Sequence, residues 1–164
     1  MTVRRLGAAE WPTALALRVA ALTESPGAFG STVERERGLP LATWHERLTA
    51  NAWFAAFDAS TAVGLVCGVR TDSPRERGLT GLWVSPSRRG TGLGDTLVAS
   101  VRDWAARHGA HRLTLEVGRA NESAIGLYAR HGFEVVGQSG PRHGEHDLVM
   151  SLDLTERRTR VSDP

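Results

Sequence analysis

Apolar residues recur every three or four positions in four stretches of the chain, which is the spacing of a helix with one buried face. The clearest example is Leu93, Leu97, Val101 and Trp104, a stretch followed by Gly109. Glycine is a common residue just past the end of a helix. The pattern predicts helices over residues 8–25, 41–51, 93–108 and 121–131.

Shorter apolar runs predict strands, because they alternate with polar residues or are bounded by turn signals. Residues 112–117 alternate Arg, Thr and Glu with Leu, Leu and Val. Residues 58–61 separate two apolar runs and predict a hairpin turn. The predicted strands cover residues 3–6, 53–57, 62–69, 79–84, 113–117, 133–136 and 147–152.

The remaining segments are polar and are expected to be loops. Residues 28–40 look flexible, with Phe29 as their one large apolar anchor, and residues 71–78 and 139–146 are expected to be a loop and a turn. In the helix 41–51 we expect Trp44, Leu48 and Leu41 to face inward.

The order of elements predicts the fold class. Three consecutive strands favour antiparallel pairing, and the helical crossover that follows them favours one parallel pair. We therefore expect an α/β (α+β) fold with a mixed, mostly antiparallel sheet of six to seven strands and helices on both faces. Residues 1–154 should form a single domain and residues 155–164 a flexible tail.

Composition narrows the functional classes. All 20 basic residues of the 164-residue chain are arginines, and they are scattered among 18 acidic residues. Nucleic-acid binding would instead favour basic residues clustered on one face. No apolar run approaches the roughly 20 residues that span a bilayer. We expect a cytoplasmic protein that binds neither nucleic acid nor membrane.

The cysteine and histidine residues give little sign of chemistry. Cys67 is the only cysteine and lies in an apolar run, so a buried thiol is favoured over a nucleophile. The close histidine pairs, His108 with His111 and His143 with His146, are not accompanied by a Cys-x-x-Cys motif or by carboxylates at a metal-binding spacing. No metal site is expected.

A glycine-rich segment between the strand 79–84 and the helix 93–108 carries the main chemical signal. It reads Leu82-Trp83-Val84-Ser85-Pro86-Ser87-Arg88-Arg89-Gly90-Thr91-Gly92-Leu93-Gly94-Asp95. The first N–H groups of a helix have no internal partner, and the helix dipole is positive there. Glycines leave these N–H groups uncovered, so the segment predicts a phosphate site.

Two other phosphate motifs can be weighed against this segment. A Walker loop needs a lysine, and the chain has none. A dinucleotide fingerprint needs Gly-x-Gly-x-x-Gly directly after a strand, whereas here the glycines are spaced Gly90-x-Gly92-x-Gly94 after a five-residue gap. With Glu116 as the acid that would bind a ribose, a nicotinamide-dependent oxidoreductase stays an alternative.

The segment Arg89-Gly90-Thr91-Gly92-Leu93-Gly94 resembles the Arg/Gln-x-x-Gly-x-Gly/Ala signature of the GNAT superfamily of N-acetyltransferases. The preceding Leu-Trp-Val-Ser-Pro resembles that family's fourth strand. The resemblance implies that the loop holds the pyrophosphate of acetyl-CoA. It also implies that the backbone around Trp83 and Val84 stabilises the oxyanion of the reaction.

A second segment also resembles the GNAT family. Asn121-x-x-Ala-x-x-Leu-Tyr128, followed by Gly-Phe, is similar to its last helix and following strand. The resemblance implies that Asn121 contacts the pantetheine arm and that Tyr128 lies beside the thioester sulfur. Asn121 could equally be only a helix cap. Gly126 within this helix costs stability, which suggests that another group packs closely against it.

The acceptor side of the site is less defined. Many relatives carry a glutamate on strand four, but residues 79–82 contain no acid. Glu116 on the neighbouring strand is the substitute we consider as general base. The resemblance places an acceptor pocket near His143 and His146, with Phe29 and Gly30 as the other wall.

The hypothesis drawn from the sequence is an acetyl-CoA-dependent N-acetyltransferase that moves an acetyl group directly to a primary amine of a small molecule or peptide. The alternative within the same fold is a non-catalytic acyl-CoA-binding or regulatory module, which the missing acid favours. The identity of the acceptor and the formation of a homodimer are left open.

Overall fold

The computed structural model describes residues 1–142 and 145–155. The helices are η1 (Ala8–Glu10), α1 (Trp11–Glu24), α2 (Val33–Gly38), α3 (Leu41–Ala50), η2 (Pro86–Arg88), α4 (Leu93–Arg107) and α5 (Glu122–Arg130). The strands are β1 (Thr2–Arg5), β2 (Ala52–Asp58), β3 (Thr61–Arg70), β4 (Glu76–Val84), β5 (Arg112–Val117), β6 (Glu134–Arg142) and β7 (Glu145–Asp153). No helix among the described residues is both long and apolar enough to cross a membrane.

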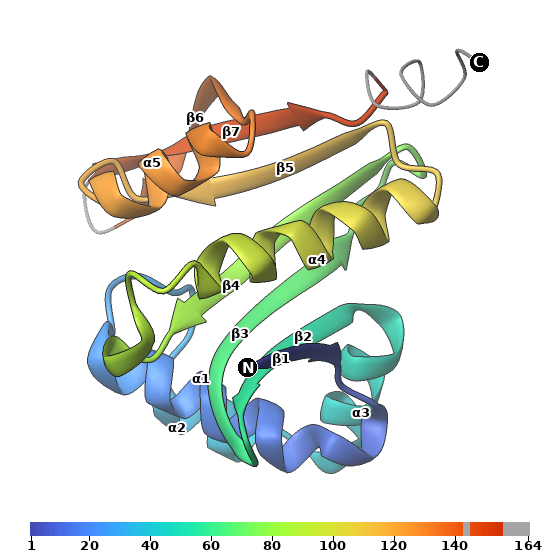
Figure 1. The fold of residues 1–164 in the computed structure, drawn as a ribbon, viewed down its shortest axis with the longest axis vertical. Coiled ribbons are helices and arrows are strands. Elements are labelled where there is room, and N and C mark those ends of the chain that lie inside the picture. The colour runs from blue at the N-terminus through green and yellow to red at the C-terminus, as the bar shows by residue number, and fades with distance from the viewer. Residues whose placement is uncertain (143–144, 156–164) are drawn as a thin grey trace.

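The strands form one seven-stranded sheet in the order β1-β2-β3-β4-β5-β7-β6 (Figure 1). Neighbouring strands are antiparallel except for β4 and β5, which are parallel. The crossover through α4 makes that parallel pair, because a parallel connection must return along the sheet. The predicted fold class is confirmed.

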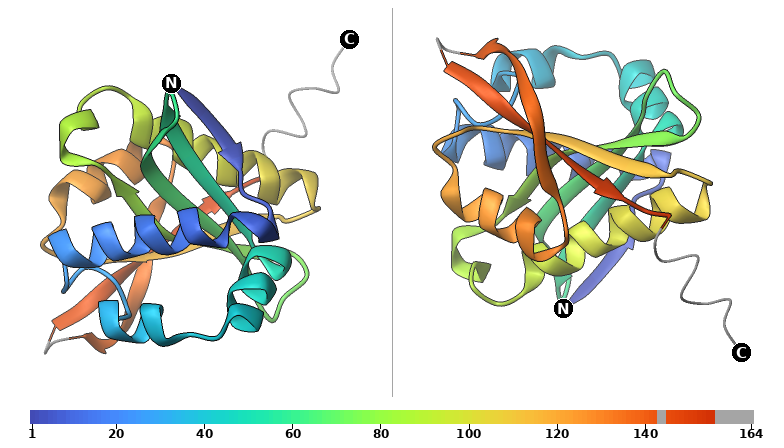
Figure 2. Two further views of the ribbon diagram at one scale, coloured as in Figure 1. Left: turned by 90° about the horizontal axis from the view of Figure 1, so that it is seen from below. Right: turned by 90° about the horizontal axis from the view of Figure 1, so that it is seen from above.

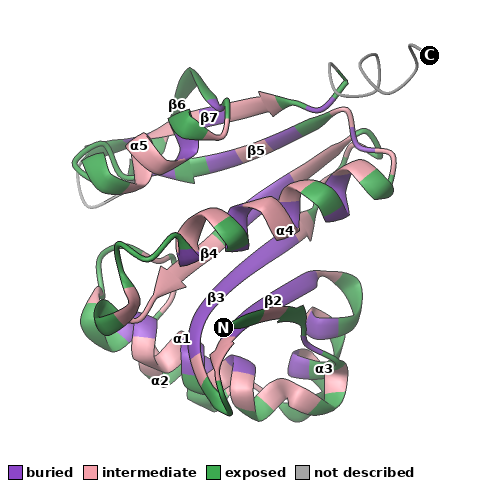
Figure 3. Ribbon diagram, in the orientation of Figure 1, coloured by how far each residue is buried: buried purple, intermediate pink, exposed green. Residues whose placement is uncertain are grey.

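Helices cover both faces of the sheet (Figure 2). The side chains of β2 alternate between the faces, with Phe54 packing among α4 residues and Trp53 among residues of α1 and α3. This is the period of two that a strand imposes. Strands β2 and β3 are buried along most of their length because both faces are covered (Figure 3).

The sheet opens between β4 and β5. Their pairing runs only from Glu76–Arg112 to Gly78–Thr114, and beyond it the two strands diverge (Figure 1). On its other side β4 has a register shift against β3, and Gly81 within the irregular stretch has φ +66°. A bulge of this kind bends a strand and increases its twist. Beyond Gly78, the edge of β4 that faces β5 is therefore not paired with any described strand.

The segment 28–40, expected to be a loop, contains the helix α2. Thr32 caps this helix, because its side chain accepts a hydrogen bond from the Arg35 N–H at 3.1 Å. Glu36 of α2 is buried and pairs with arginines of α1 and α3. Two arginines distant in the sequence thus stabilise a helix that has little apolar surface of its own.

Other boundaries also differ from the predictions. Strand β4 begins at Glu76 rather than at residue 79, because Glu76 pairs with β5 and residues 77–78 pair with both β3 and β5. The turn expected at residues 139–146 is wrong, since β6 and β7 pair as far as Arg142 and Glu145 across a register shift near Pro141. Leu41, expected inside, is 51% exposed, whereas Trp44 and Leu48 are buried as predicted.

Two glycines give a prediction about packing. A Cβ on Gly68 would lie 2.6 Å from the Trp104 ring, whereas a Cβ on Gly126 would meet nothing within 4 Å. The close packing expected at Gly126 is therefore wrong. Replacing Gly68 with Ala should destabilise the protein by about 1–3 kcal/mol through overpacking.

The matched control is Gly126→Ala, which should stabilise the protein by up to about 1 kcal/mol because alanine favours a helix. Urea denaturation of both variants measures the two effects. Equal stability changes in the two variants would contradict the packing argument.

Candidate functional site

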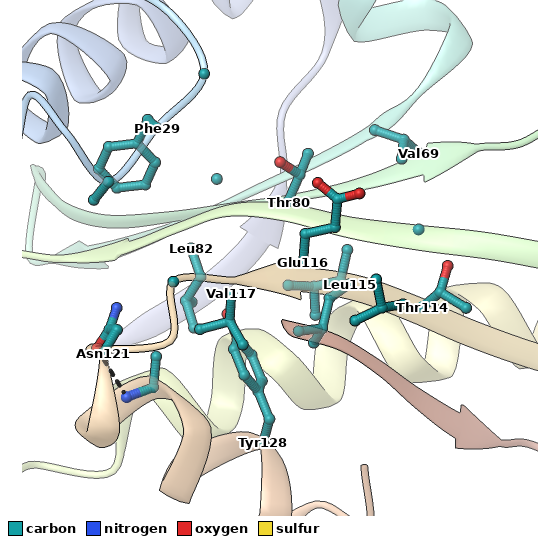
Figure 4. A pocket seen from close by; sticks show the side chains of 18 of the residues that line it. Phe29, Val69, Thr80, Leu82, Thr114, Leu115, Glu116, Val117, Asn121 and Tyr128 are labelled. Atoms are coloured by element: carbon teal, nitrogen blue, oxygen red, sulfur yellow. Dashed lines mark hydrogen bonds between the residues drawn. The ribbon is translucent and has the colours of Figure 1, made fainter. Parts of the chain in front are cut away.

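A large cavity lies where β4 and β5 diverge. We call it the main cavity; its volume is about 690 Å³. The cavity is bounded by four parts of the chain, which are β4, β5, the segment after α1 and the start of α5 (Figure 4). The predicted site residues that line it are Phe29, Gly30, Leu82, Glu116, Asn121 and Tyr128. The opening of the sheet thus brings together residues from four separate parts of the chain.

A second cavity of about 460 Å³, the loop cavity, adjoins the main cavity and contains the glycine-rich loop. The two cavities share Phe29, Leu82 and Asn121 as lining residues. The loop cavity is also lined by Trp83, Val84, Arg88, Arg89, Gly90, Gly92, Leu93, Gly94 and Asp95. One continuous groove therefore connects the start of α4 with Tyr128.

The start of α4 has the geometry of an anion site. Gly92 precedes the helix with φ +83°, and Gly90 has φ +74°. A Cβ on either glycine would meet no atom within 4 Å, so the space above the loop is open. The first helical hydrogen bond joins the Thr96 N–H to the Gly92 carbonyl at 3.2 Å. The three preceding N–H groups are left for an anion.

Both arginines of the loop have acidic partners. Arg88 pairs with Asp58 at the end of β2. Arg89 donates to Glu24 at 2.7 Å, and the same Glu24 oxygen accepts from the Trp83 indole N–H at 2.6 Å. The hydrogen bond from Trp83, followed in size of effect by the bond from Arg89, holds the pKa of Glu24 below its usual range. The arginines are thereby positioned beside the loop, and an anion would compete with carboxylates for them.

Two loop residues have local structural roles. The Thr91 hydroxyl donates to the Arg88 carbonyl at 2.6 Å, and Thr91 is not among the residues lining the loop cavity. The Asp95 carboxylate lies 3.0 Å from His131 Nε2 and 3.3 Å from Arg130, so it joins α4 to the end of α5.

Asn121 and Tyr128 lie two turns apart on the start and middle of α5. The Asn121 side-chain oxygen accepts from the Ala124 N–H at 3.2 Å, which makes it the N-cap (Figure 4). Its position between the two cavities leaves its amide group beside the groove. Tyr128 is 6% exposed, and burial raises the pKa of its hydroxyl. A neutral phenol that retains its proton can act as a proton donor.

Glu116 points from β5 into the main cavity (Figure 4). The parallel register pairs Gly78 with Thr114, so continuing it by two residues would set Thr80 against Glu116. The strands have already separated there, and both residues line the main cavity. A carboxylate on β5 therefore reaches the space that an acid on β4 would have occupied.

Comparison with known proteins agrees with this geometry. The sequence model of the acetyltransferase (GNAT) family matches residues 18–133. The chain belongs to the GNAT family. Streptothricin acetyltransferase from Streptomyces lavendulae is 40% identical over 75 residues, which are 42% of this chain and only 40% of that protein.

Two further similarities extend over more of this GNAT chain. L-methionine sulfoximine/L-methionine sulfone acetyltransferase from Pseudomonas paraeruginosa is 31% identical over 137 residues, covering 72% of this chain and 78% of that protein. The structure of YncA from Salmonella typhimurium with its cofactor acetyl-CoA has a TM-score of 0.73 at 23% identity, covering 94% of each chain. This structural likeness shows the fold.

Sequence reasoning missed three features of this GNAT site. The bulge at Gly81 was signalled by an isolated glycine within a strand. Glu24, which holds Trp83 and Arg89, and Arg18, which lines the main cavity, carried no local signal. Both are polar residues on a predicted helix, and only the packing of α1 beside β4 gives them a role.

Of the two histidines predicted to border the acceptor pocket, the structure describes only His146. The Nδ1–H group of His146 donates to the Ser139 carbonyl at 2.7 Å, and His146 is not among the residues lining the main cavity. His143 lies outside the described residues. Within residues 1–142 and 145–155, no group of three or more His, Cys, Asp or Glu side chains is arranged to hold a metal ion.

Cys67 is buried in β3, and burial raises the pKa of its thiol to about 12. The thiol therefore stays neutral in the physiological range and is a poor nucleophile. We predict that iodoacetamide at about pH 8 alkylates Cys67 in the folded protein at least about tenfold more slowly than in urea. Mass spectrometry of timed samples measures the rates, and equal rates would contradict an inert thiol.

Proposed function

We propose that this GNAT protein is an acetyl-CoA-dependent N-acetyltransferase that transfers the acetyl group directly to an amine. The observation that carries the proposal is the continuous groove from the uncovered N–H groups of α4 to Tyr128. In such a groove the pyrophosphate would lie at the helix N-terminus. The pantetheine arm would then follow the open edge of β4 past Asn121.

The reaction forms one bond and breaks another. The neutral amine attacks the thioester carbonyl, so that an N–C bond forms while the carbonyl oxygen gains negative charge. Backbone N–H groups along the unpaired edge of β4, around Trp83 and Val84, can stabilise that oxyanion. Collapse of the intermediate breaks the C–S bond, and the Tyr128 hydroxyl donates a proton to the leaving thiolate. The attacking nitrogen loses its extra proton to give the amide, and a proton taken up from solvent restores the Tyr128 hydroxyl.

The amine must lose a proton to become a nucleophile. An alkyl amine with a pKa near 10.4 is mostly protonated at neutral pH, so a nearby base would assist. We propose that Glu116 accepts this proton directly or through water, because it lies in the main cavity. Glu76, which also lines that cavity, adds negative charge that attracts a cationic amine.

The test of the function is release of free CoA thiol from acetyl-CoA with a panel of primary amines. Turnover with at least one amine is expected. The relatives named for streptothricin and for methionine sulfoximine make polycationic amines and amino-acid analogues the first compounds for this panel. Binding of acetyl-CoA without turnover of any amine would favour the non-catalytic acyl-CoA-binding module.

Replacing Gly92 with Asp should abolish acetyl-CoA binding, because a carboxylate at the start of α4 would repel the pyrophosphate. For the wild type, acetyl-CoA at about 100 times its Kd should add about 2.7 kcal/mol of stability, or about 5–10 °C in melting temperature. The variant should show almost no shift.

Gly109→Asp is the matched control for backbone strain. Gly109 has φ +77° with nothing within 4 Å, and it lies at the other end of the same helix. This variant should retain the full shift with acetyl-CoA. If both variants lose the shift equally, strain rather than a phosphate site explains the result.

Replacing Tyr128 with Phe should lower kcat by about 10²-fold or more, because the leaving thiolate loses its proton donor. The melting shift with acetyl-CoA should remain, since the ring still packs against Phe133. Because burial raises the Tyr128 pKa, the wild-type rate should show no loss from this group as pH rises toward about 10. An unchanged kcat in the variant would remove Tyr128 from the acid role.

A further inference from the structure

A third cavity of about 230 Å³, the side cavity, extends from the main cavity toward α2 and α3. The two cavities share Arg18, Gly30, Val69, Thr80 and Gly81 as lining residues. A molecule in the main cavity can therefore place one end in the side cavity.

The side cavity carries excess positive charge. Three arginines, Arg18, Arg35 and Arg47, line it together with one carboxylate, Glu36. Burial alone raises the pKa of Glu36, but its polar surroundings, the hydrogen bond from Arg47 and the charges of Arg47 and Arg18 together lower it. Glu36 is thus ionised, and it neutralises only one of the three guanidinium groups.

Arg18 is the charged group at the junction of the two cavities. Its side chain is 13% exposed, and its one hydrogen bond to another described residue reaches Glu36 at 3.4 Å. Arg47 contacts the other Glu36 oxygen at 2.7 Å. Glu36 therefore has a closer partner, and most of the five N–H donors of Arg18 are available to a ligand.

The neighbours of Arg18 fix where it points. Its guanidinium carbon lies 5.6 Å from the centre of the Phe29 ring. Its Nη1 would be 3.6 Å from a Cβ on Gly81, so the glycine of the bulge leaves room beside the guanidinium. A nearly buried arginine held this way has already lost most of its conformational freedom, which favours binding of a carboxylate.

A second donor in the side cavity also lacks a partner. Trp53 lines this cavity and is 6% exposed, and its indole N–H is buried without a hydrogen bond to any described residue. Buried donors of this kind are rare because an unmade hydrogen bond is costly. An acceptor atom supplied by a ligand or by water would satisfy it.

Apart from Arg18, the charged residues that line the main cavity are acidic. Glu76 and Glu116 line it, and they attract a protonated amine. The joined cavities therefore present carboxylates in the main cavity and an excess of guanidinium groups in the side cavity.

We infer that the acetyl acceptor is an amino acid or a similar amine that carries a carboxylate, and that Arg18 binds this carboxylate at the mouth of the side cavity. The inference rests on the proposed acetyltransferase function, which it deepens by naming the class of acceptor. A polycationic amine without a carboxylate would leave the positive charge that Glu36 does not neutralise without a counterion.

The first test uses wild-type protein and pairs of acceptors that differ in one group. Each L-α-amino acid, and each ω-amino acid from β-alanine to 6-aminohexanoate, is compared with its own carboxamide, and spermidine is included. An amino-acid carboxamide is the less basic amine, so a larger fraction of it is unprotonated at neutral pH. In the absence of a carboxylate site, this larger fraction of free amine would favour the carboxamide. We expect kcat/KM for the best carboxylate to exceed that of its carboxamide by about ten- to a hundredfold.

The second test compares variants of Arg18. Arg18→Gln should raise the KM of the best amino acid by about ten- to a hundredfold, leave its carboxamide within about twofold and leave the KM for acetyl-CoA unchanged. Arg18→Lys, which keeps the charge, should recover part of the loss. A merely structural role would instead weaken both acceptors equally.

Arg102→Gln is the matched control. Arg102 is also a helical arginine, its side chain is 16% exposed, and its ion pair with Asp103 is long at 3.7 Å. It does not line the main or the side cavity. This variant should keep the preference for the carboxylate.

The outcomes separate the two hypotheses. If spermidine or the carboxamides are the better acceptors, acetyl transfer stands and the carboxylate site is wrong. If no amine is acetylated, the proposed acetyltransferase function is wrong. The carboxylate site is then tested by the shift in melting temperature that each amino acid and each carboxamide causes in the presence of CoA. A melting shift with an amino acid that is lost in Arg18→Gln and kept in Arg102→Gln would support the carboxylate site. The absence of such a shift would overturn the carboxylate site.

Discussion

The separation of β4 from β5 is the constraint on which the site depends. Three paired residues hold the strands together at one end, and the bulge at Gly81 bends β4 beyond them. An open strand edge normally invites pairing with another strand. Here the edge lies inside the protein and borders a cavity, so its N–H and C=O groups are available to a ligand. The groove, the position of Tyr128 and the access to Arg18 all follow from this opening.

The parts of the site that could be predicted from the sequence are those made by neighbouring residues. The glycine loop reads directly as an anion site, because a helix start and its preceding glycines are local in the chain. Asn121 and Tyr128 could be paired for the same reason, since seven residues are close to two helical turns. The sheet class followed from the order of the predicted elements, and residues 112–117 of β5 could be read as a half-buried strand from their alternation.

What could not be predicted depends on contacts between distant residues. Helix α2 was predicted to be a loop because its stability depends on ion pairs of Glu36 with Arg18 and Arg47. These arginines lie 18 and 11 positions away in the sequence. The extension of β6 and β7 depends on a register shift near Pro141 that no local signal fixes. Arg18, Glu24 and Trp53 gained their roles only when α1 packed against β3 and β4 and β2 joined the sheet beside β3. Helix propensity and periodicity carry no information about such partners.

The same long-range contacts explain how the cavities of this chain can present both acidic and basic groups to a ligand. The loop cavity offers N–H groups and arginines held by Glu24 and Asp58, so an anion there must displace or share these partners. In the side cavity, Glu36 orders Arg18 and Arg47 while neutralising one charge, which leaves a net positive site. Glu24, Asp58 and the buried Glu36 thus work as positioning groups for guanidinium side chains. Because an arginine already held in place loses less entropy on binding, such pairs favour selective recognition of small anionic groups.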